Sequence, residues 1–369
     1  MDAQSSWTAT DHLDSFDCTL ANLGEIVLET LEAANVRSVA EIGAENGLFT
    51  QELLGWAERA GVERISAIDP APRERLLELA RTCPELELIV GTSHDVLPRL
   101  ELPDAVIIDG DHNYFTVREE LRLIAERSGG ELPLLLVHDI GWPLARRDSY
   151  HDPERIPAGN RRPLAHDAFL VPGVAGVADR GLYYECAAAT EGGPHNGVLT
   201  AVEDFLAGDA DLRLAIVPPF FGLGVVWHRD APWAPAVEQS LAPWDRNPVL
   251  ERVEAKRVAH LVAEYESLQA IDAMRSEDYE LQLLLTMMLH SKAFAIAERV
   301  SRLRQGGRPM FSREQVESAL ARVQADNDLI GAVGPASANG AQAESDDAPA
   351  GGRPPAPAPG ITETAAGAS

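Results

Sequence analysis

Short runs of apolar residues alternate along the first part of the chain with longer stretches whose apolar residues recur at helical spacing. The short runs end near a glycine or an acidic residue and predict buried strands, whereas the longer stretches predict helices. We expect strands over residues 36–42, 64–69, 86–90, 103–109 and 132–138, and helices over 20–34, 48–57 and 114–127. Strands alternating with helices in this way predict an α/β fold with a nucleotide-binding sheet.

The pattern changes after the fifth predicted strand. Residues 142–193 form a long connection, and a connection of this length inside a compact domain usually serves a function. A helix is predicted over 196–206, with Asn196 as its N-cap. Residues 212–217 and 222–227 predict two further strands that a short link joins into a hairpin.

The turn after the first predicted strand holds Gly43 and Gly47. A strand, a tight glycine turn and a helix open a nucleotide-binding sheet, but a dinucleotide fingerprint needs a glycine where this chain has Glu45. The carboxylates of Glu41 and Glu45 would repel a pyrophosphate. They suit instead a ligand with a positively charged centre and no phosphate, such as S-adenosylmethionine (SAM), which carries a sulfonium and an ammonium group.

The segment Glu41-x-Gly43-x-x-x-Gly47 resembles motif I of the class I SAM-dependent methyltransferases. The resemblance implies a Rossmann-like, seven-stranded methyltransferase sheet whose last strand is antiparallel, and the predicted final hairpin fits that sheet. It also implies that Glu41, Gly43 and Gly47 line the cofactor site.

Two further places in the sequence are candidates for cofactor contacts. Asp69, at the tip of the second predicted strand, is placed to accept hydrogen bonds from both ribose hydroxyls, with a helix N-cap as the alternative. The loop after the third strand lies where this fold contacts adenine and offers Ser93, His94 and Asp95, although such loops are polar in any case.

Acidic and imidazole side chains gather after the fourth and fifth predicted strands. Asp109, Asp111 and His112 follow the fourth, and His138 and Asp139 follow the fifth. In open α/β folds the carboxyl edge of the sheet is where ligands bind. Two such clusters on neighbouring strands favour a functional role over helix capping or simple solvent contact.

The segment from Asp109 to Tyr114 resembles the corresponding motif of metal-dependent O-methyltransferases that act on sugars of macrolide and aminocoumarin antibiotics. The segment from His138 to Trp142 resembles the fifth-strand motif of the catechol type, with His138 in place of an aspartate. The resemblance implies a divalent metal on Asp109, Asp139 and His138. The metal is either Mg²⁺ or a transition metal, which imidazole favours.

His112 is the predicted general base of the reaction. Asp111 is either a third metal ligand or the group that orients His112, and the residues leave both roles open. Residues 142–193 are predicted to form a lid over the acceptor. Arg146 and Arg147 in this segment either bind the acceptor or pair with neighbouring acids, among them Asp148.

The composition limits the partners of the chain. Asp and Glu total 58 against 31 Lys and Arg, a formal charge of −27 over 369 residues. A strongly acidic surface repels nucleic acids and anionic membranes, so we expect neither as a partner. The three cysteines are scattered, which indicates neither a disulfide framework nor a thiolate zinc site. No signal segment or membrane-spanning run is visible, so a cytoplasmic location is expected.

Four segments are expected from these patterns. Residues 1–35 form an N-terminal helical segment and 36–230 the methyltransferase domain. Residues 231–330 form a helical extension that includes a capping box at Ser312, and 331–369 are a disordered tail rich in Ala, Gly and Pro. Helical stripes without visible chemistry predict oligomerisation or docking, with a homo-oligomer through these helices as one form.

The sequence therefore predicts a SAM-dependent O-methyltransferase, assisted by a metal, that acts on a hydroxyl of a sugar or a glycosylated small molecule. A catalytically silent scaffold that recruits a partner such as a glycosyltransferase is the main alternative. A nicotinamide oxidoreductase is disfavoured by Glu45 and by the final hairpin.

Overall fold

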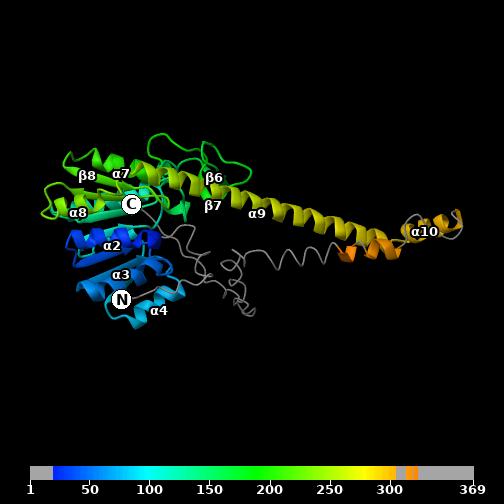
Figure 1. Cartoon of the computed structure of the whole chain (residues 1–369), viewed down its shortest axis with the longest axis horizontal. Helices are drawn as coiled ribbons and strands as arrows, with labels where there is room; N and C mark the ends of the chain where they lie inside the picture. The colour runs from blue at the N-terminus through cyan, green and yellow to red at the C-terminus, as the bar shows by residue number, and fades with distance from the viewer. Residues whose placement is uncertain (1–19, 305–312, 319, 323–369) are drawn as a thin grey trace, which may run out of the picture. The chain divides into compact units, whose positions relative to one another are not determined.

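The computed structural model describes residues 20–304, 313–318 and 320–322 (Figure 1). The chain forms two compact units that divide after Ile271. The first contains the sheet and every candidate site residue, and the second begins within a long helix. None of the described helices is long and apolar enough to cross a membrane.

The first unit is built on one seven-stranded sheet in the order β3-β2-β1-β4-β5-β9-β8. The five strands β1 to β5 pair in parallel, and β9 is antiparallel to both β5 and β8. The predicted Rossmann-like methyltransferase sheet is therefore confirmed, including its final hairpin. The strands are β1 Ser38–Ile42, β2 Arg64–Asp69, β3 Leu86–Val90, β4 Ala105–Ile108, β5 Leu134–His138, β8 Leu212–Val217 and β9 Leu223–His228.

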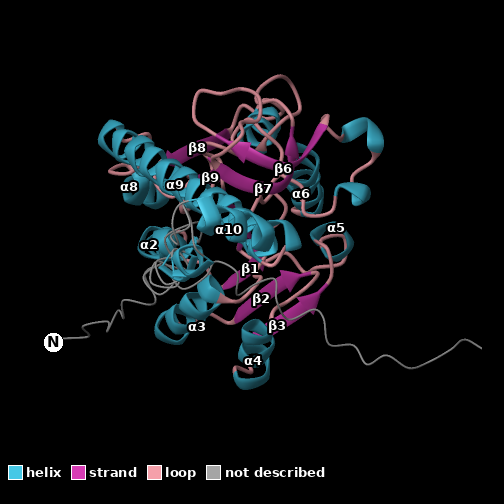
Figure 2. Cartoon of the chain, turned by 90° about the vertical axis from the view of Figure 1, so that its right-hand side faces the viewer, coloured by secondary structure: helices cyan, strands magenta, loops and turns pink. Residues whose placement is uncertain are grey.

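Helices cover both faces of this sheet (Figure 2). Every residue of β4 and β5 is buried, as expected for central strands between two helical layers. One face packs against η1 Leu20–Leu23, α2 Gly24–Ala33, α3 Leu48–Ala60, α4 Glu74–Thr82 and α8 Ala234–Leu241. The other packs against α5 Ser93–Val96, α6 Tyr114–Arg127 and α7 Val198–Leu206.

The register of the parallel strands determines where the site lies. Ile42 of β1 pairs with Ile68 of β2 and Ile108 of β4, and Ile108 pairs with Val137 of β5. The residues just beyond these positions therefore come together at one carboxyl edge of the sheet.

The connection between β5 and α7 is not a plain loop. It contains a two-stranded antiparallel sheet of β6 Leu164–Leu170 and β7 Leu182–Ala188, and two short helical turns, η2 Pro153–Arg155 and η3 Ala158–Asn160. Sequence analysis missed this hairpin because His166 and Asp167 interrupt the apolar pattern of β6.

The prediction that Asn196 caps the next helix is wrong. Helix α7 begins two residues later, after Gly197, which has φ of +88°. The Asn196 side chain instead accepts a hydrogen bond from the Asp148 backbone N–H and donates to the carbonyls of Thr190 and Gly192. It thereby ties the β5–α7 connection together.

Helix α9 spans Pro248–Leu289 and passes from the first unit into the second. Within the first unit its Val258, Leu261 and Val262 are buried against Leu182 and Phe221. The predicted extension from residue 231 therefore begins with helices that pack in the same unit as the sheet.

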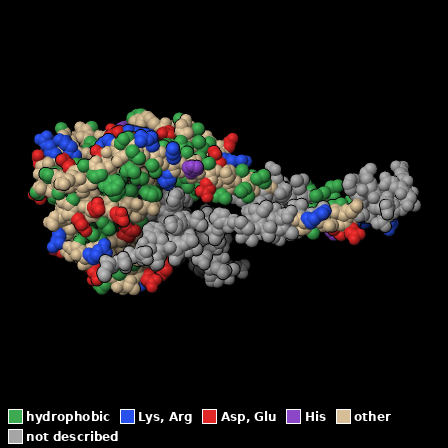
Figure 3. Space-filling view, viewed as in Figure 1, with side chains coloured by type: hydrophobic (Ala, Val, Ile, Leu, Met, Phe, Trp, Pro, Cys, Tyr) green, Lys and Arg blue, Asp and Glu red, His purple; other side chains and the backbone are tan. Residues whose placement is uncertain are grey.

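In the second unit the end of α9 is followed by α10 Lys292–Arg304. Large apolar side chains are exposed in this unit, and Figure 3 shows hydrophobic surface on its described part. They include Met274, Leu283, Leu284, Met287 and Met288. Ser312 of the predicted capping box and the predicted tail from residue 331 lie outside the described residues.

Candidate functional site

The glycine turn after β1 brings the start of α3 to the carboxyl edge. Gly43 and Gly47 both have positive φ, +86° and +75°, which favours glycine. A Cβ on Gly43 would overlap the backbone carbonyl of Asp109, so only a glycine lets β1 leave the sheet this close to β4. The turn that carries the sequence motif is therefore next to the acidic cluster.

Asp69 holds this turn to the end of β2. Its Oδ2 accepts a hydrogen bond from the Glu45 backbone N–H at 2.8 Å, and its Oδ1 accepts one from the Ala71 N–H at 2.7 Å. Asp69 thus caps a local turn and not helix α4, which begins at Glu74. Each carboxylate oxygen has a second lone pair, so the predicted ribose contact stays a prediction that this geometry permits.

Glu41 is buried beneath the turn. Its carboxyl group accepts a hydrogen bond from the Thr50 hydroxyl at 2.6 Å. Burial raises the pKa of Glu41 to about 8, against the effect of the Thr50 bond and with the added repulsion of Asp109 and Asp69. A cationic ligand at this edge would favour the ionised form, so the predicted cofactor role of Glu41 remains consistent with its surroundings.

The predicted adenine loop forms the short helix α5. Thr92 caps it by accepting from the Asp95 N–H, and its hydroxyl donates to Asp95 at 2.7 Å. His94 Nε2 lies 3.2 Å from the Thr116 carbonyl of α6, and Ser93 is buried. Asp95 and His94 thus have structural contacts here, and the adenine contacts of all three residues stay predictions.

Sequence analysis missed Glu120, which is 1% exposed in the middle of α6. Burial raises the pKa of Glu120 to about 8. A hydrogen bond with Ser93 opposes this rise, and repulsion from the Asp111 carboxylate adds to it. Its helical spacing places it on the apolar face of α6, and a charged residue on such a face was the signal that could have found it.

The ends of β4 and β5 meet through His138. Its Nδ1 lies 2.9 Å from Asp109 Oδ1 and 3.6 Å from Asp139 Oδ1, and its Nε2 lies 3.0 Å from the Phe220 carbonyl oxygen. A carboxylate and a carbonyl can only accept hydrogen bonds, so both ring nitrogens must donate. The ring is therefore an imidazolium, 1% exposed, between two carboxylates.

The electrostatics agree with this proton assignment. Burial alone would lower the pKa of His138, but attraction to Asp109 and Asp139 and the two hydrogen bonds raise it to about 9. A cation thus already occupies the space between the two aspartates. The orphaned Asp139 Oδ1, which has no hydrogen-bond partner, faces the same ring.

As hydrogen-bonded here, Asp109, His138 and Asp139 do not offer a divalent ion a complete set of ligand lone pairs. An imidazole whose two nitrogens both carry protons has no lone pair to offer a metal. A divalent ion held by all three residues would have to displace a proton from His138, so the metal stays a prediction, and we assign no catalytic step to it.

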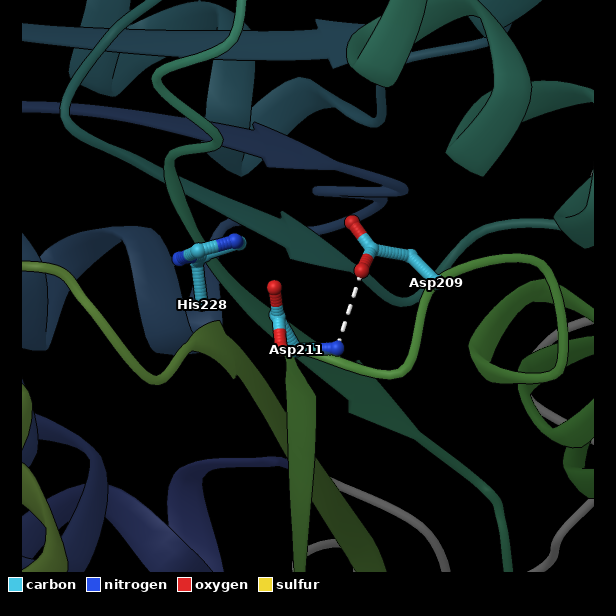
Figure 4. A group of neighbouring side chains, drawn as sticks. All are labelled: Asp209, Asp211 and His228. Atoms are coloured by element: carbon cyan, nitrogen blue, oxygen red, sulfur yellow. Dashed lines mark hydrogen bonds between the residues drawn. The ribbon is translucent and has the colours of Figure 1, made fainter.

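Elsewhere in the described part of the chain, Asp209, Asp211 and His228 bring possible ligand atoms within 4.8 Å of one another (Figure 4). They lie at the opposite edge of the sheet, where β8 begins and β9 ends. His228 Nδ1 accepts from the Asp230 N–H, and Asp211 pairs with Arg229 at 3.1 Å. These contacts engage His228 Nδ1 and one oxygen of Asp211, and we assign the group no role in the reaction.

His112 and Asp139 form a second imidazole–carboxylate pair. His112 Nε2 lies 3.5 Å from Asp139 Oδ2, and the His112 side chain is 19% exposed. The pair therefore joins a partly accessible ring to the carboxylate that also faces His138. The remaining nitrogen of His112, Nδ1, is the one that can face an acceptor.

Asp111 makes structural contacts that the sequence did not predict, and its role as a metal ligand stays a prediction. It accepts hydrogen bonds from the Asn113 side-chain amide at 2.6 Å, from the Thr116 hydroxyl at 3.1 Å and from the His151 N–H at 3.3 Å. These contacts hold the start of α6 and the β5–α7 connection. Asp139, and not Asp111, is the carboxylate beside His112.

The arginines of the connection are structural. Arg146 forms a bidentate pair with Glu203 of α7. Arg147 is buried and donates to the carbonyls of Ala188, Ala175 and Gly176. Both side chains thus contact the protein itself: Arg146 pairs with Glu203 and not with Asp148, and Arg147 also lies 4.0 Å from Glu191. The acceptor contact of the two arginines stays a prediction.

Comparison with known proteins identifies one domain of the chain. Residues 40–140 match the family model described as a methyltransferase domain, which runs from β1 through β5 and so contains the glycine turn, Asp69 and the β4–β5 cluster. Residues 40–140 thus carry a methyltransferase domain, and the sheet order agrees with the predicted SAM-dependent methyltransferase. No curated protein matches the sequence.

Solved structures with a likeness to the chain include the SAH-bound methyltransferase PaMTH1 of Podospora anserina, at 16% identity and a TM-score of 0.39, over 61% of this chain and 85% of that one. The O-methyltransferase TomG of Streptomyces achromogenes, in complex with SAM, matches at 18% identity and a TM-score of 0.34, over 57% of this chain and 81% of that one. These likenesses are distant, and the assignments below come from the chain's own residues.

Proposed function

We propose that this methyltransferase transfers the SAM methyl group to a hydroxyl oxygen, and that the acceptor is a sugar or a glycosylated small molecule. The observation that carries the proposal is the His112–Asp139 pair, at the same sheet edge as the glycine turn and Asp69. The sugar class rests on the resemblance of the segment from Asp109 to Tyr114.

A hydroxyl is a poor nucleophile until its proton has a place to go. When bound, SAM supplies the electrophilic methyl carbon. His112 Nδ1 accepts the hydroxyl proton as the oxygen attacks, and Asp139 orients the ring through Nε2 and stabilises its positive charge. Alignment of the oxygen with the methyl–sulfur bond is then an effect of positioning by the surrounding chain.

His138 balances the charge of the cluster. Its imidazolium offsets the negative charges of Asp109 and Asp139, so Asp139 can be buried beside His112 without an unpaired charge. In this proposal a protonated side chain of the protein replaces the metal that the sequence predicted.

The test is methyl transfer from methyl-labelled SAM to two acceptor panels, hydroxylated glycosides and catechols, followed by mass spectrometry. We expect a mass gain of one methylene on a glycoside. Methylation of catechols alone would contradict the sugar class. SAM binding without transfer to any hydroxyl would favour the scaffold alternative, and titration with NAD separates the oxidoreductase, which alone would bind it.

A further inference from the structure

The turn that joins β8 to β9 has an unusual backbone. Phe220, Phe221 and Gly222 have φ of +53°, +63° and +86°, so three successive residues are left-handed. Only the glycine adopts this region without strain. Two phenylalanines therefore need contacts from elsewhere in the fold to hold them in it.

Helix α9 supplies those contacts. Glu254 Oε2 accepts from the Phe220 N–H at 3.1 Å, and Oε1 accepts from the Phe221 N–H at 2.9 Å. Successive left-handed residues point their N–H groups to one side, which forms a site for an anion, and here one carboxylate occupies it. The Glu254 side chain is 13% exposed, so these charge-assisted bonds are shielded from water.

Arg257, one turn further along α9, completes the arrangement. Its guanidinium donates two hydrogen bonds to the Glu254 carboxylate, at 2.7 and 2.8 Å. The guanidinium carbon also lies 5.3 Å from the ring centre of Phe220 and 4.5 Å from that of Phe221. The pair thus contacts both the backbone and the side chains of the turn.

The same turn contacts the β4–β5 cluster. The Phe220 carbonyl accepts the hydrogen bond from His138 Nε2, and the Phe221 carbonyl accepts one from the Gly141 N–H. A Cβ on Gly141 would overlap the Phe221 carbonyl, so the backbones of the two segments are in close contact and leave no room for a side chain. The orientation of the Phe220 carbonyl therefore decides where the His138 ring lies.

We propose that Glu254 and Arg257 are positioning residues for the transfer reaction: they hold the Phe220–Gly222 turn so that its carbonyl fixes His138 between Asp109 and Asp139. An ordinary ion pair between neighbours on a helix contributes little and is exposed. This one is nearly buried and its carboxylate binds two backbone amides of another element. The start of α9 is thus part of the site and not an appendage to it.

The test compares Glu254→Gln with Glu251→Gln, a matched change at an exposed position of the same helix. The readout is hydrogen exchange of the His138 ring N–H in full-length protein labelled with ¹⁵N at its histidines; the resonance is assigned by its loss in His138→Gln. Glu254→Gln weakens both amide contacts, so we expect exchange to accelerate by about tenfold or more. The control should exchange at the wild-type rate.

A second variant, Arg257→Lys, keeps the charge but loses the planar fork and should give a smaller acceleration. Exchange at the wild-type rate in folded Glu254→Gln overturns the proposal. The catalytic part of the proposal rests on the proposed function, and there Glu254→Gln should lower kcat and leave the SAM dissociation constant unchanged. Because ring exchange needs no acceptor, it decides the His138 contact even if no methyl transfer is found.

Discussion

The two halves of the carboxyl edge are constructed in different ways. In the β1–β2 half, the glycine turn and Asp69 are held by contacts close in sequence or by the neighbouring parallel strand. In the β4–β5 half, His138 depends on Phe220, which is 82 residues away, and Phe220 depends on Glu254 of α9. The geometry of the first half is thus determined by nearby residues and strands, and that of the second half by the β8–β9 turn and α9, which lie far along the sequence.

This difference predicts that substitutions in the two halves impair different steps of the reaction. Changes in the β1–β2 half should weaken SAM binding, and changes in the β4–β5 half should slow transfer with SAM binding intact.

The largest effect is expected at the predicted base. His112→Gln removes the proton acceptor, so turnover at saturating SAM should fall by about 10²–10⁴-fold, the usual contribution of general base catalysis. Isothermal titration of SAM into the same sample should give the wild-type dissociation constant. A variant that turns over normally would remove His112 from the mechanism.

Stability should fall as pH rises, because both halves rest on buried carboxyl groups. The pKa values of Glu41 and Glu120 are raised to about 8, so the folded state holds protons that the unfolded state has released between about pH 4.5 and 8. The pKa of His138 is raised to about 9, which acts in the same direction. The protonated ring stabilises the folded state fully below its unfolded pKa of 6.5, and this stabilisation is lost as pH rises through 9.

Glu120→Gln tests this pH dependence. The variant lacks the carboxyl charge, so its unfolding free energy should decline less between pH 6 and 9, by roughly a few kcal/mol. Denaturant unfolding at the two pH values measures it, with the exposed Glu131→Gln as the matched control. Parallel pH profiles for the Glu120 variant and the wild type would show that this carboxyl group does not hold its proton.

The arginines of the β5–α7 connection offer a matched pair. Arg147→Ala removes a buried guanidinium that donates to the carbonyls of Ala188, Ala175 and Gly176, and it should lower the unfolding free energy by about 3 kcal/mol. Arg146→Ala removes a half-exposed ion pair and should cost about 0.5 kcal/mol. Thermal unfolding of the two variants measures this difference in stability. A raised acceptor KM in a stable Arg147→Ala variant would instead support the predicted acceptor contact.

In the β1–β2 half, Asp69→Ala should raise the SAM dissociation constant by about 10–100-fold, or about 1.5–3 kcal/mol, if both ribose contacts use the ionised carboxylate. Turnover at saturating SAM should change little. The exposed Glu74→Ala on α4 serves as the control, and unchanged SAM affinity in folded Asp69→Ala would disprove the ribose assignment.

The same contrast explains how much the sequence could predict. Runs of apolar residues and glycine punctuation located the strands of the sheet within a few residues, because those signals are local. The placement of Asp109, His112, His138 and Asp139 at one edge followed from strand order. The partners of these residues did not, since the link from His138 to Phe220 is a tertiary contact without a sequence signal.

The metal prediction, which stays untested, shows most clearly what a sequence motif leaves open. Imidazole and carboxylate side chains at strand ends are metal ligands by type, and their order matched a known motif. Whether an imidazole offers a lone pair depends on what faces its two nitrogens, and here both faces hold acceptors. That information appears only when β4, β5 and the β8–β9 turn are seen together.

The most direct test of the account is the rate of methyl transfer after exhaustive chelation. The protein is treated with EDTA, desalted, and assayed with SAM and the glycoside identified by the acceptor screen, with and without added Mg²⁺ or Mn²⁺. If the His138 imidazolium and the His112–Asp139 pair do the work assigned to them, the rate changes less than about twofold in every sample, within the scatter expected when no transition-state contact is lost. Loss of turnover on chelation, restored by either ion, would contradict the account.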